Sequence, residues 1–274
     1  MTASTAITGT AAGVPFLAVP PAGGRADAPV VVAWHLMDAP CTEAAFAAAL
    51  PLAGLDAWRI YLGLPLCGSR LPAGGFDELM RLGYEDAVLN LQGPISAQAA
   101  AESAPAVAEL RDRLGLGDGP VGLLGGSLGA AVAQQVVADR QLDVAASVLV
   151  SPLVQLRPAV EALGRVFGVE YPWSESSLEV ARRMDFVARA DEVAACPATR
   201  LVVGAEDDEA GFREPASRLR DALERRSVAA DLVVVPGMGH ALAEEPGIEP
   251  APQLPAAAEV DRLAADWFTR HLGR

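Results

Sequence analysis

The chain has 274 residues, about half of them apolar, and a formal net charge of −14. This length suits one large α/β domain, and the charge excludes a nucleic-acid partner and docking on an anionic membrane, since both need a surplus of positive charge. All 21 basic residues are arginines. A Walker-type phosphate loop and a pyridoxal phosphate Schiff base, which need lysine, are therefore excluded as well.

The cysteines and the N-terminal segment indicate a cytoplasmic protein. Cys41, Cys67 and Cys196 are far apart and lack the CxxC spacing of a metal site, so we interpret them as free thiols in a reducing compartment. Residues 1–12 have no positive charge and no long apolar run, unlike a secretory signal. No stretch approaches the roughly 20 apolar residues of a membrane span.

Short apolar runs alternate with longer helical segments, which predicts βα units and a mostly parallel sheet. Residues 6–19, interrupted by glycine, predict an antiparallel entry pair. Residues 63–94 are expected to be poor in regular structure, and a loop of that length often contributes to a binding site. In this first half we expect strands at residues 30–34, 58–62 and 121–124, and helices at residues 42–50, 97–114 and 128–139.

The second half continues the alternation after one interruption. A strand at residues 144–150 is followed by residues 154–195, which contain two helical stretches broken at residues 171–174. Together the elements predict an α/β fold with a mostly parallel sheet of eight (or seven) strands and helices on both faces. The remaining expected elements are strands at residues 200–203 and 231–235 and helices at residues 214–226 and 256–271.

Residues 125–129 (GGSLG) fit the G-x-S-x-G pattern, and their context makes the match specific. An apolar strand runs directly into the pattern and a helix leaves it. A serine at such a turn is held in a strained backbone that small neighbours permit, with its hydroxyl above the sheet. A dinucleotide-binding turn is disfavoured, because the G-x-G-x-x-G pattern is not matched at this turn when it is counted from Gly122 or from Gly126. Ser127 is therefore the candidate nucleophile.

The base for this serine follows by elimination among three histidines. Histidine is the usual base near neutral pH, and a Ser–Lys pair is impossible without lysine. His271 is expected in the last helical turn as a solvated cation, and His35 directly follows an early strand. His240 lies in a loop after the last strand, which can bring an imidazole across the strand ends. His240 is therefore the candidate base.

Three acidic residues, Glu206, Asp207 and Asp208, follow the strand at residues 200–203. A carboxylate at this place can accept the Nδ1 hydrogen of the histidine and fix its tautomer. Asp207, three residues past the turn at Gly204, is favoured, with Asp208 and Glu206 as alternatives. The other common position, directly after the preceding strand, offers no acid.

Over nearly the whole chain these residues resemble the α/β-hydrolase superfamily, whose chain order is also serine, acid, histidine. Residues 204–207 (GAED) and 239–240 (GH) look like its acid and base motifs. Residues 34–37 (WHLM) look like its His-Gly segment after the third strand, with Leu36 in place of the usual glycine. The resemblance implies a single domain over residues 1–274 with a helical cap at residues 154–195, most similar to small soluble serine esterases.

This resemblance also implies an oxyanion hole. The backbone N–H groups of Leu128 and Met37 would form it, with Leu36 as the alternative to Met37, and His35 would be structural. Apolar side chains of the cap and of the loops could line the substrate site, although core packing is the alternative for each: Leu64, Leu66, Phe167, Tyr171, Trp173 and Met37.

The implied reaction is hydrolysis of a small-molecule carboxylic ester through an acyl-enzyme on Ser127, without a cofactor or a metal. Thioesterase, amidase, lactonase and cofactor-free perhydrolase activities would use the same three residues and remain alternatives. A non-catalytic ligand-binding protein on the same fold is a further alternative. The oligomeric state is left open.

Overall fold

A computed structural model of the chain describes residues 6–24 and 27–273. The expectation that residues 1–12 are not a secretory signal concerns a segment whose first five residues lie outside the described ones. Within the described ranges, no helix has both the length and the apolar character needed to cross a membrane.

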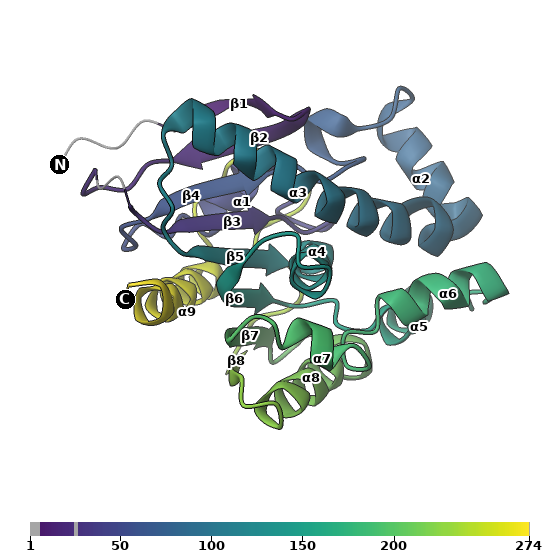
Figure 1. Cartoon of the computed structure of the whole chain (residues 1–274). Coiled ribbons are helices and arrows are strands. Elements are labelled where there is room, and N and C mark those ends of the chain that lie inside the picture. Colours follow the sequence, from purple (N-terminus) through teal and green to yellow (C-terminus); the bar gives the residue numbers. More distant parts are fainter. Residues whose placement is uncertain (1–5, 25–26, 274) are drawn as a thin grey trace.

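An eight-stranded sheet forms the centre of the molecule (Figure 1). Its strand order is β1-β2-β4-β3-β5-β6-β7-β8. β2 pairs antiparallel with β1 and with β4, whereas the other pairings are parallel, which confirms the mostly parallel sheet and the antiparallel entry pair. The strands are β1 (Ile7–Ala11), β2 (Val14–Val19), β3 (Val30–Trp34), β4 (Trp58–Leu62), β5 (Val121–Gly126), β6 (Val144–Val150), β7 (Ala198–Gly204) and β8 (Ala229–Val235).

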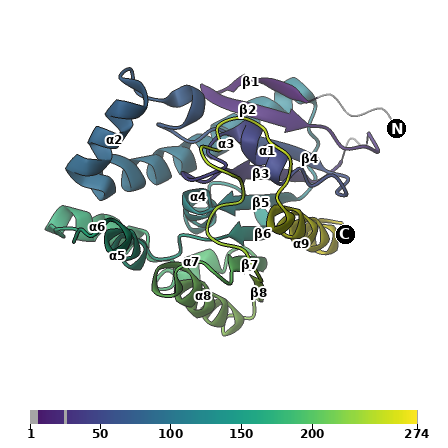
Figure 2. The ribbon, with the colours of Figure 1, turned by 180° about the vertical axis from the view of Figure 1, so that it is seen from behind.

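Helices cover both faces of the sheet (Figures 1 and 2). Val31 and Ala33 belong to the core beneath α1 and α9, whereas Val30 and Val32 belong to the core beneath α3, α4 and α8, as the alternation of a strand requires. The helices are α1 (Glu43–Ala49), α2 (Gly75–Asp86), α3 (Gly93–Leu114), α4 (Leu128–Ala138), α5 (Leu156–Phe167), α6 (Glu175–Arg183), α7 (Ala190–Val193), α8 (Glu214–Glu224) and α9 (Pro255–Leu272), with short segments η1 (Gly68–Arg70), η2 (Ala87–Gln92) and η3 (Glu209–Arg213).

The expectation that residues 63–94 are poor in regular structure is wrong, because this segment contains α2, the π-helical η2 and the start of α3. None of the residues of α2 is buried, and Phe76, Met80 and Tyr84 are exposed. The sequence nevertheless suggests a loop here, because the helix begins at Gly75 and contains Gly83, and glycine is unfavourable within a helix. The π turn after it also breaks the 3.6-residue period.

Three helices, α5, α6 and α7, occupy the segment at residues 154–195 between β6 and β7. This segment is hydrogen-bonded to the segment after β4, which contains α2 and η2. The Tyr171 hydroxyl donates to Asp86 Oδ1 at 2.5 Å, and the same oxygen accepts the N–H groups of Val88 and Leu89 at the start of η2. α6 also packs closely on the start of α3, where a Cβ on Gly93 would lie 2.8 Å from a methyl group of Val180. That these helices act as a cap remains a prediction.

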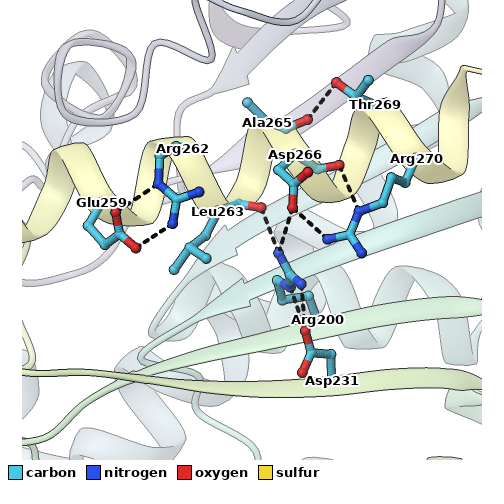
Figure 3. Close-up of polar contacts among 9 residues, drawn as sticks. All are labelled: Arg200, Asp231, Glu259, Arg262, Leu263, Ala265, Asp266, Thr269 and Arg270. Carbon is cyan, nitrogen blue, oxygen red and sulfur yellow. Dashed lines mark hydrogen bonds and ion pairs between the residues drawn. The ribbon is translucent and has the colours of Figure 1, made fainter.

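A buried arginine joins β7, β8 and α9 (Figure 3). The Arg200 side chain is 7% exposed, and its Nη2 lies 2.5 Å from Asp231 Oδ2 on β8. Its Nη1 donates to the carbonyl of Leu263 on α9 at 3.0 Å, and the guanidinium lies 4.6 Å from the centre of the Trp267 ring. The guanidinium therefore fixes α9 to the edge of the sheet on which two of the site segments are built.

We expect the Arg200→Ala variant to lose about 2–4 kcal/mol of the free energy of unfolding, because a buried carbonyl and a partly buried carboxylate lose their partner. Arg262→Ala is the matched control. Arg262 lies on the same helix and pairs with Glu259 at 2.6 Å, but both side chains are exposed, so its loss should be under about 0.5 kcal/mol. Urea denaturation measures both, and equal losses would contradict the role given to Arg200.

Candidate active site

Four segments that follow parallel strands meet at the carboxyl edge of the sheet, where open α/β sheets place their ligands. They follow β3, β5, β7 and β8. His240 Nε2 lies 2.8 Å from Ser127 Oγ, and His240 Nδ1 lies 2.9 Å from Asp207 Oδ2. The structure therefore joins the three residues singled out in the sequence in one continuous hydrogen-bonded chain.

Ser127 stands at a sharp turn between β5 and α4. Its backbone has φ 47° and ψ −112°, a combination that residues with a side chain rarely adopt. A Cβ on Gly125 would lie 2.4 Å from the carbonyl oxygen of Gly129, and a Cβ on Gly129 would lie 2.3 Å from that of Trp34. Both glycines are therefore required sterically, and the packed turn holds the serine in its strained conformation.

Leu36 stands where the resemblance leads us to expect glycine. Its side chain is fully buried, and one of its methyl groups lies 2.3 Å from the position that a Cβ on Gly126 would take. The leucine thus fills the space that Gly126 leaves beside the nucleophile. The departure from the family pattern at position 36 is accommodated by the glycine opposite it.

The acid turn and the histidine loop are in direct backbone contact. A Cβ on Gly204 would lie 2.2 Å from the carbonyl oxygen of Met238, and the N–H of Glu206 donates to the same oxygen at 2.9 Å. This approach, which only glycine allows, sets Asp207 beside His240.

The two other acids of the turn have different surroundings. Asp208 accepts the N–H of Gly211 at 2.7 Å at the start of η3 and pairs with Arg165 of α5 at 3.0 Å. The side chain of Glu206 is exposed. Of the three candidates, Asp207 is the one that the structure places on His240.

The environment of His240 favours its charged form. Burial lowers the pKa of His240, but the hydrogen bond and the charge of Asp207, together with the charge of Asp38, outweigh burial and raise the pKa above its ordinary value of 6.5. Asp38 Oδ2 lies 3.7 Å from Nε2, and the ring of Phe212 lies 4.2 Å from the imidazole centre. Our reading of the sequence missed both neighbours, although Asp38 could have been noticed as the first acid after β3.

The other two histidines lie apart from this chain of hydrogen bonds. His35 is fully buried, its Nδ1 lies 2.6 Å from the carbonyl of Leu36, and its Nε2 accepts the N–H of Leu64 at 3.1 Å. Burial lowers the pKa of His35 to about 4, so the ring is neutral and connects the segments after β3 and β4. His271 lies in the last turn of α9 with its ring 4.2 Å from that of Trp267.

One of the expected oxyanion donors, Leu128, directly follows the nucleophile in the chain. Leu128 is the first residue of α4, where a backbone N–H has no acceptor within the helix. Met37 is half-buried in the loop after β3. That Leu128 and Met37, or Leu36, bind an oxyanion remains a prediction.

The residues expected to line an apolar substrate wall differ in exposure. Leu64 is fully buried in the core, so it is not available to a substrate, whereas Phe167 is 72% exposed. Tyr171 and Trp173 pack edge to face, with ring centres 4.7 Å apart. Among the described residues, no group of three or more His, Cys, Asp or Glu side chains is arranged to hold a metal ion.

Sheet order and site geometry together define the class of protein. The strand order and the serine at a strained strand-to-helix turn are those of the α/β-hydrolase fold, and the protein is a serine hydrolase. Residues 104–273, more than half of the chain, match the model of the prolyl oligopeptidase family of peptidases. The chain belongs to this family.

Solved structures with the same fold include esterases and peptidases. TT1662 from Thermus thermophilus is 18% identical, with a TM-score of 0.63 over 98% of this chain and 99% of that one. Carboxyl esterase 2 from the fungus Tuber melanosporum is 17% identical, with a TM-score of 0.62 over 99% and 87%. A puromycin-hydrolyzing peptidase from Mycobacterium tuberculosis is 17% identical, with a TM-score of 0.64 over 98% of this chain and 40% of that one. A comparison with curated protein sequences finds no significant match.

We expect hydrolytic activity to fall on the acid side with an apparent pKa above 6.5, because the base acts only when neutral and the pKa of His240 is raised. Removing the negative charge in Asp38→Asn should move this limb to lower pH, since the imidazolium loses one of its stabilising neighbours. The measurement is kcat/KM of both proteins from pH 4 to pH 9. An acid limb that stays in place in the variant would contradict the contact between Asp38 and His240.

Proposed function

We propose that this serine hydrolase cleaves a carboxylic ester of a small molecule through an acyl-enzyme on Ser127. The observation that supports this best is the hydrogen-bonded chain from Ser127 Oγ through both nitrogens of His240 to Asp207. The buried carboxylate of Asp207 lies 2.9 Å from Nδ1, where it would accept the Nδ1 hydrogen and leave Nε2 free to take the serine proton.

The reaction then has two halves. Nε2 of His240 takes the proton of Ser127 while Oγ forms a bond to the carbonyl carbon. The bond from that carbon to the leaving oxygen breaks, and the alcohol departs with the proton held by His240. In the second half a water molecule gives its proton to His240 and attacks the acyl carbon. The acid is released and Oγ recovers its proton.

The oxyanion of each tetrahedral intermediate would be bound by the backbone N–H groups of Leu128 and Met37. The position of Leu128 at the start of α4 supports this role, because a helix N-terminus favours negative charge. One such donor typically contributes on the order of 10²–10³ in rate. In the same proposal α5 and α6 act as a cap that selects the substrate, with no cofactor taking part.

Peptide-bond cleavage is the second candidate, and membership of the prolyl oligopeptidase family favours it. Thioesters, amides, lactones and peroxide-dependent perhydrolysis use the same residues. The similarity in fold to an esterase that covers nearly all of this chain supports the ester. A panel of p-nitrophenyl esters of increasing acyl length, run beside p-nitroanilides of the same acyl groups, separates ester cleavage from amide cleavage.

We expect a fluorophosphonate probe to label the wild-type protein and not Ser127→Ala, because the probe reacts only with a serine activated by a neighbouring base. Intact-protein mass spectrometry measures the adduct. Ser151→Ala is the matched control, since Ser151 also follows a parallel strand, β6, and has a positive φ, but it has no role in the proposal. No labelling of the wild type, or equal labelling of Ser127→Ala, would refute the proposed function.

The substitution Asp207→Asn should lower kcat by about 10³–10⁴, because an amide cannot hold the required tautomer of His240. Asp208→Asn is the control one residue away. An asparagine can still accept the N–H of Gly211 at the start of η3, so kcat should change by less than about threefold while only the surface pair with Arg165 is lost. Steady-state kinetics on the best ester of the panel measures both, and the opposite ranking would assign the acid to position 208.

A further inference from the structure

Asp38 places a second carboxylate at the reacting end of the imidazole. Its Oδ2 lies 3.7 Å from His240 Nε2, the nitrogen that also lies 2.8 Å from Ser127 Oγ. Its side chain is 55% exposed, whereas that of Asp207 on the other nitrogen is 2% exposed. Of the two carboxylates beside the imidazole, Asp38 is thus the one that is open to solvent and to a substrate.

The charge of Asp38 is not neutralised by an arginine. Within residues 6–24 and 27–273, its only ion pair is the one with His240. The arginines beside the acid turn are engaged elsewhere, Arg165 with Asp208 and Arg213 with the carbonyl of Asp207. When His240 is neutral, the surface beside its Nε2 therefore carries a negative charge that no arginine neutralises.

A second carboxylate, that of Glu245, belongs to a loop that is bonded to the segment after Asp38. Burial raises the pKa of the Cys41 thiol, and the charges of Glu245 and Asp38 act in the same direction. The loop of Glu245 is attached there, since the N–H of Cys41 donates to the carbonyl of Gly247 at 2.9 Å. With the net charge of −14, these groups produce a negative potential that attracts cations.

The contact between Asp38 and His240 sets an upper limit on the distance from Asp38 to the leaving group of a bound substrate. His240 passes a proton from Nε2 to the leaving atom, and proton transfer needs the two atoms to be about 3 Å apart. The leaving atom of a bound substrate therefore lies within about 7 Å of Asp38 Oδ2. A cationic group two carbon atoms beyond the leaving oxygen can reach this carboxylate.

We infer that Asp38 is a specificity-determining residue that favours substrates with a positively charged leaving group, such as the esters of quaternary amino alcohols. This inference rests on the proposed ester hydrolysis by Ser127 and names the leaving group on which that reaction acts. The carboxylate stabilises the bound cation by direct attraction and repels substrates with an anionic group at the same place.

The test is a pair of esters that differ only in charge. Choline and 3,3-dimethylbutanol have the same shape, with N⁺ in one replaced by carbon in the other, and both are esterified with the acyl group that the p-nitrophenyl panel shows to be best. The quantity measured is the ratio of kcat/KM for the choline ester to kcat/KM for the neutral ester, at a pH on the plateau of both pH profiles. Intrinsic differences in reactivity between the esters cancel when this ratio is compared between proteins.

We expect the ratio to fall by about 5- to 20-fold in Asp38→Asn, from the attraction of two charges roughly 5 Å apart in a solvated site. Added salt should lower the ratio more in the wild type than in the variant, which keeps the other negative charges but lacks that of Asp38. Asp112→Asn is the matched control. Asp112 is an exposed acid near the C-terminal end of α3, at the opposite edge of the sheet, so its removal changes the net charge equally and should leave the ratio unchanged.

Two results would overturn the inference, and they are distinguishable from a failure of the proposed function. An equal ratio in the wild type and Asp38→Asn, with both esters hydrolysed, removes the role of Asp38 and leaves the ester hydrolase intact. Equal falls in Asp38→Asn and Asp112→Asn would reduce the effect to net charge alone. Absence of fluorophosphonate labelling, in contrast, removes the proposed function and the inference together.

Discussion

The site depends on one close approach between two backbones. Gly204 at the end of β7 lets the loop after β8 come so near that a single methyl group at position 204 would overlap the carbonyl of Met238. This contact sets the imidazole of His240 between a buried carboxylate and the hydroxyl of Ser127. The serine turn is built on the same principle, since Gly125 and Gly129 remove side chains where two backbones meet. Close backbone packing at these glycines therefore positions the serine, the imidazole and the carboxylate.

The imidazole of His240 has a carboxylate beside each nitrogen. The two carboxylates differ in burial, and therefore in what their charges can act on. Asp207 is withdrawn from solvent and directed at Nδ1, so it orients the ring and cannot meet a substrate. Asp38 is open to solvent near Nε2, so its charge acts both on the ring and on whatever approaches it. In the reaction that we propose, the same functional group therefore orients the base in one place and selects the substrate in the other.

The sequence was sufficient for the sheet and for the three residues that the structure joins, because both depend on local patterns. Apolar runs bounded by turn residues mark strands such as β3 and β4, and the turns after parallel strands must share one edge. α2 was missed because Gly75 and Gly83 lower its helix propensity and a π turn follows it. Asp38 was missed because its contact with His240 joins positions about 200 residues apart, and no local pattern encodes that contact.

The hydrogen bond from Tyr171 to Asp86 makes the two segments above the sheet parts of one assembly. They are inserted after different strands, β6 and β4, yet Asp86 holds both the phenol and the first turn of η2. Transplanting the helices after β6 from a relative would therefore deprive Asp86 of a partner and loosen a region that was not exchanged. These two segments are not interchangeable modules, and engineering of this scaffold has to replace them as a pair.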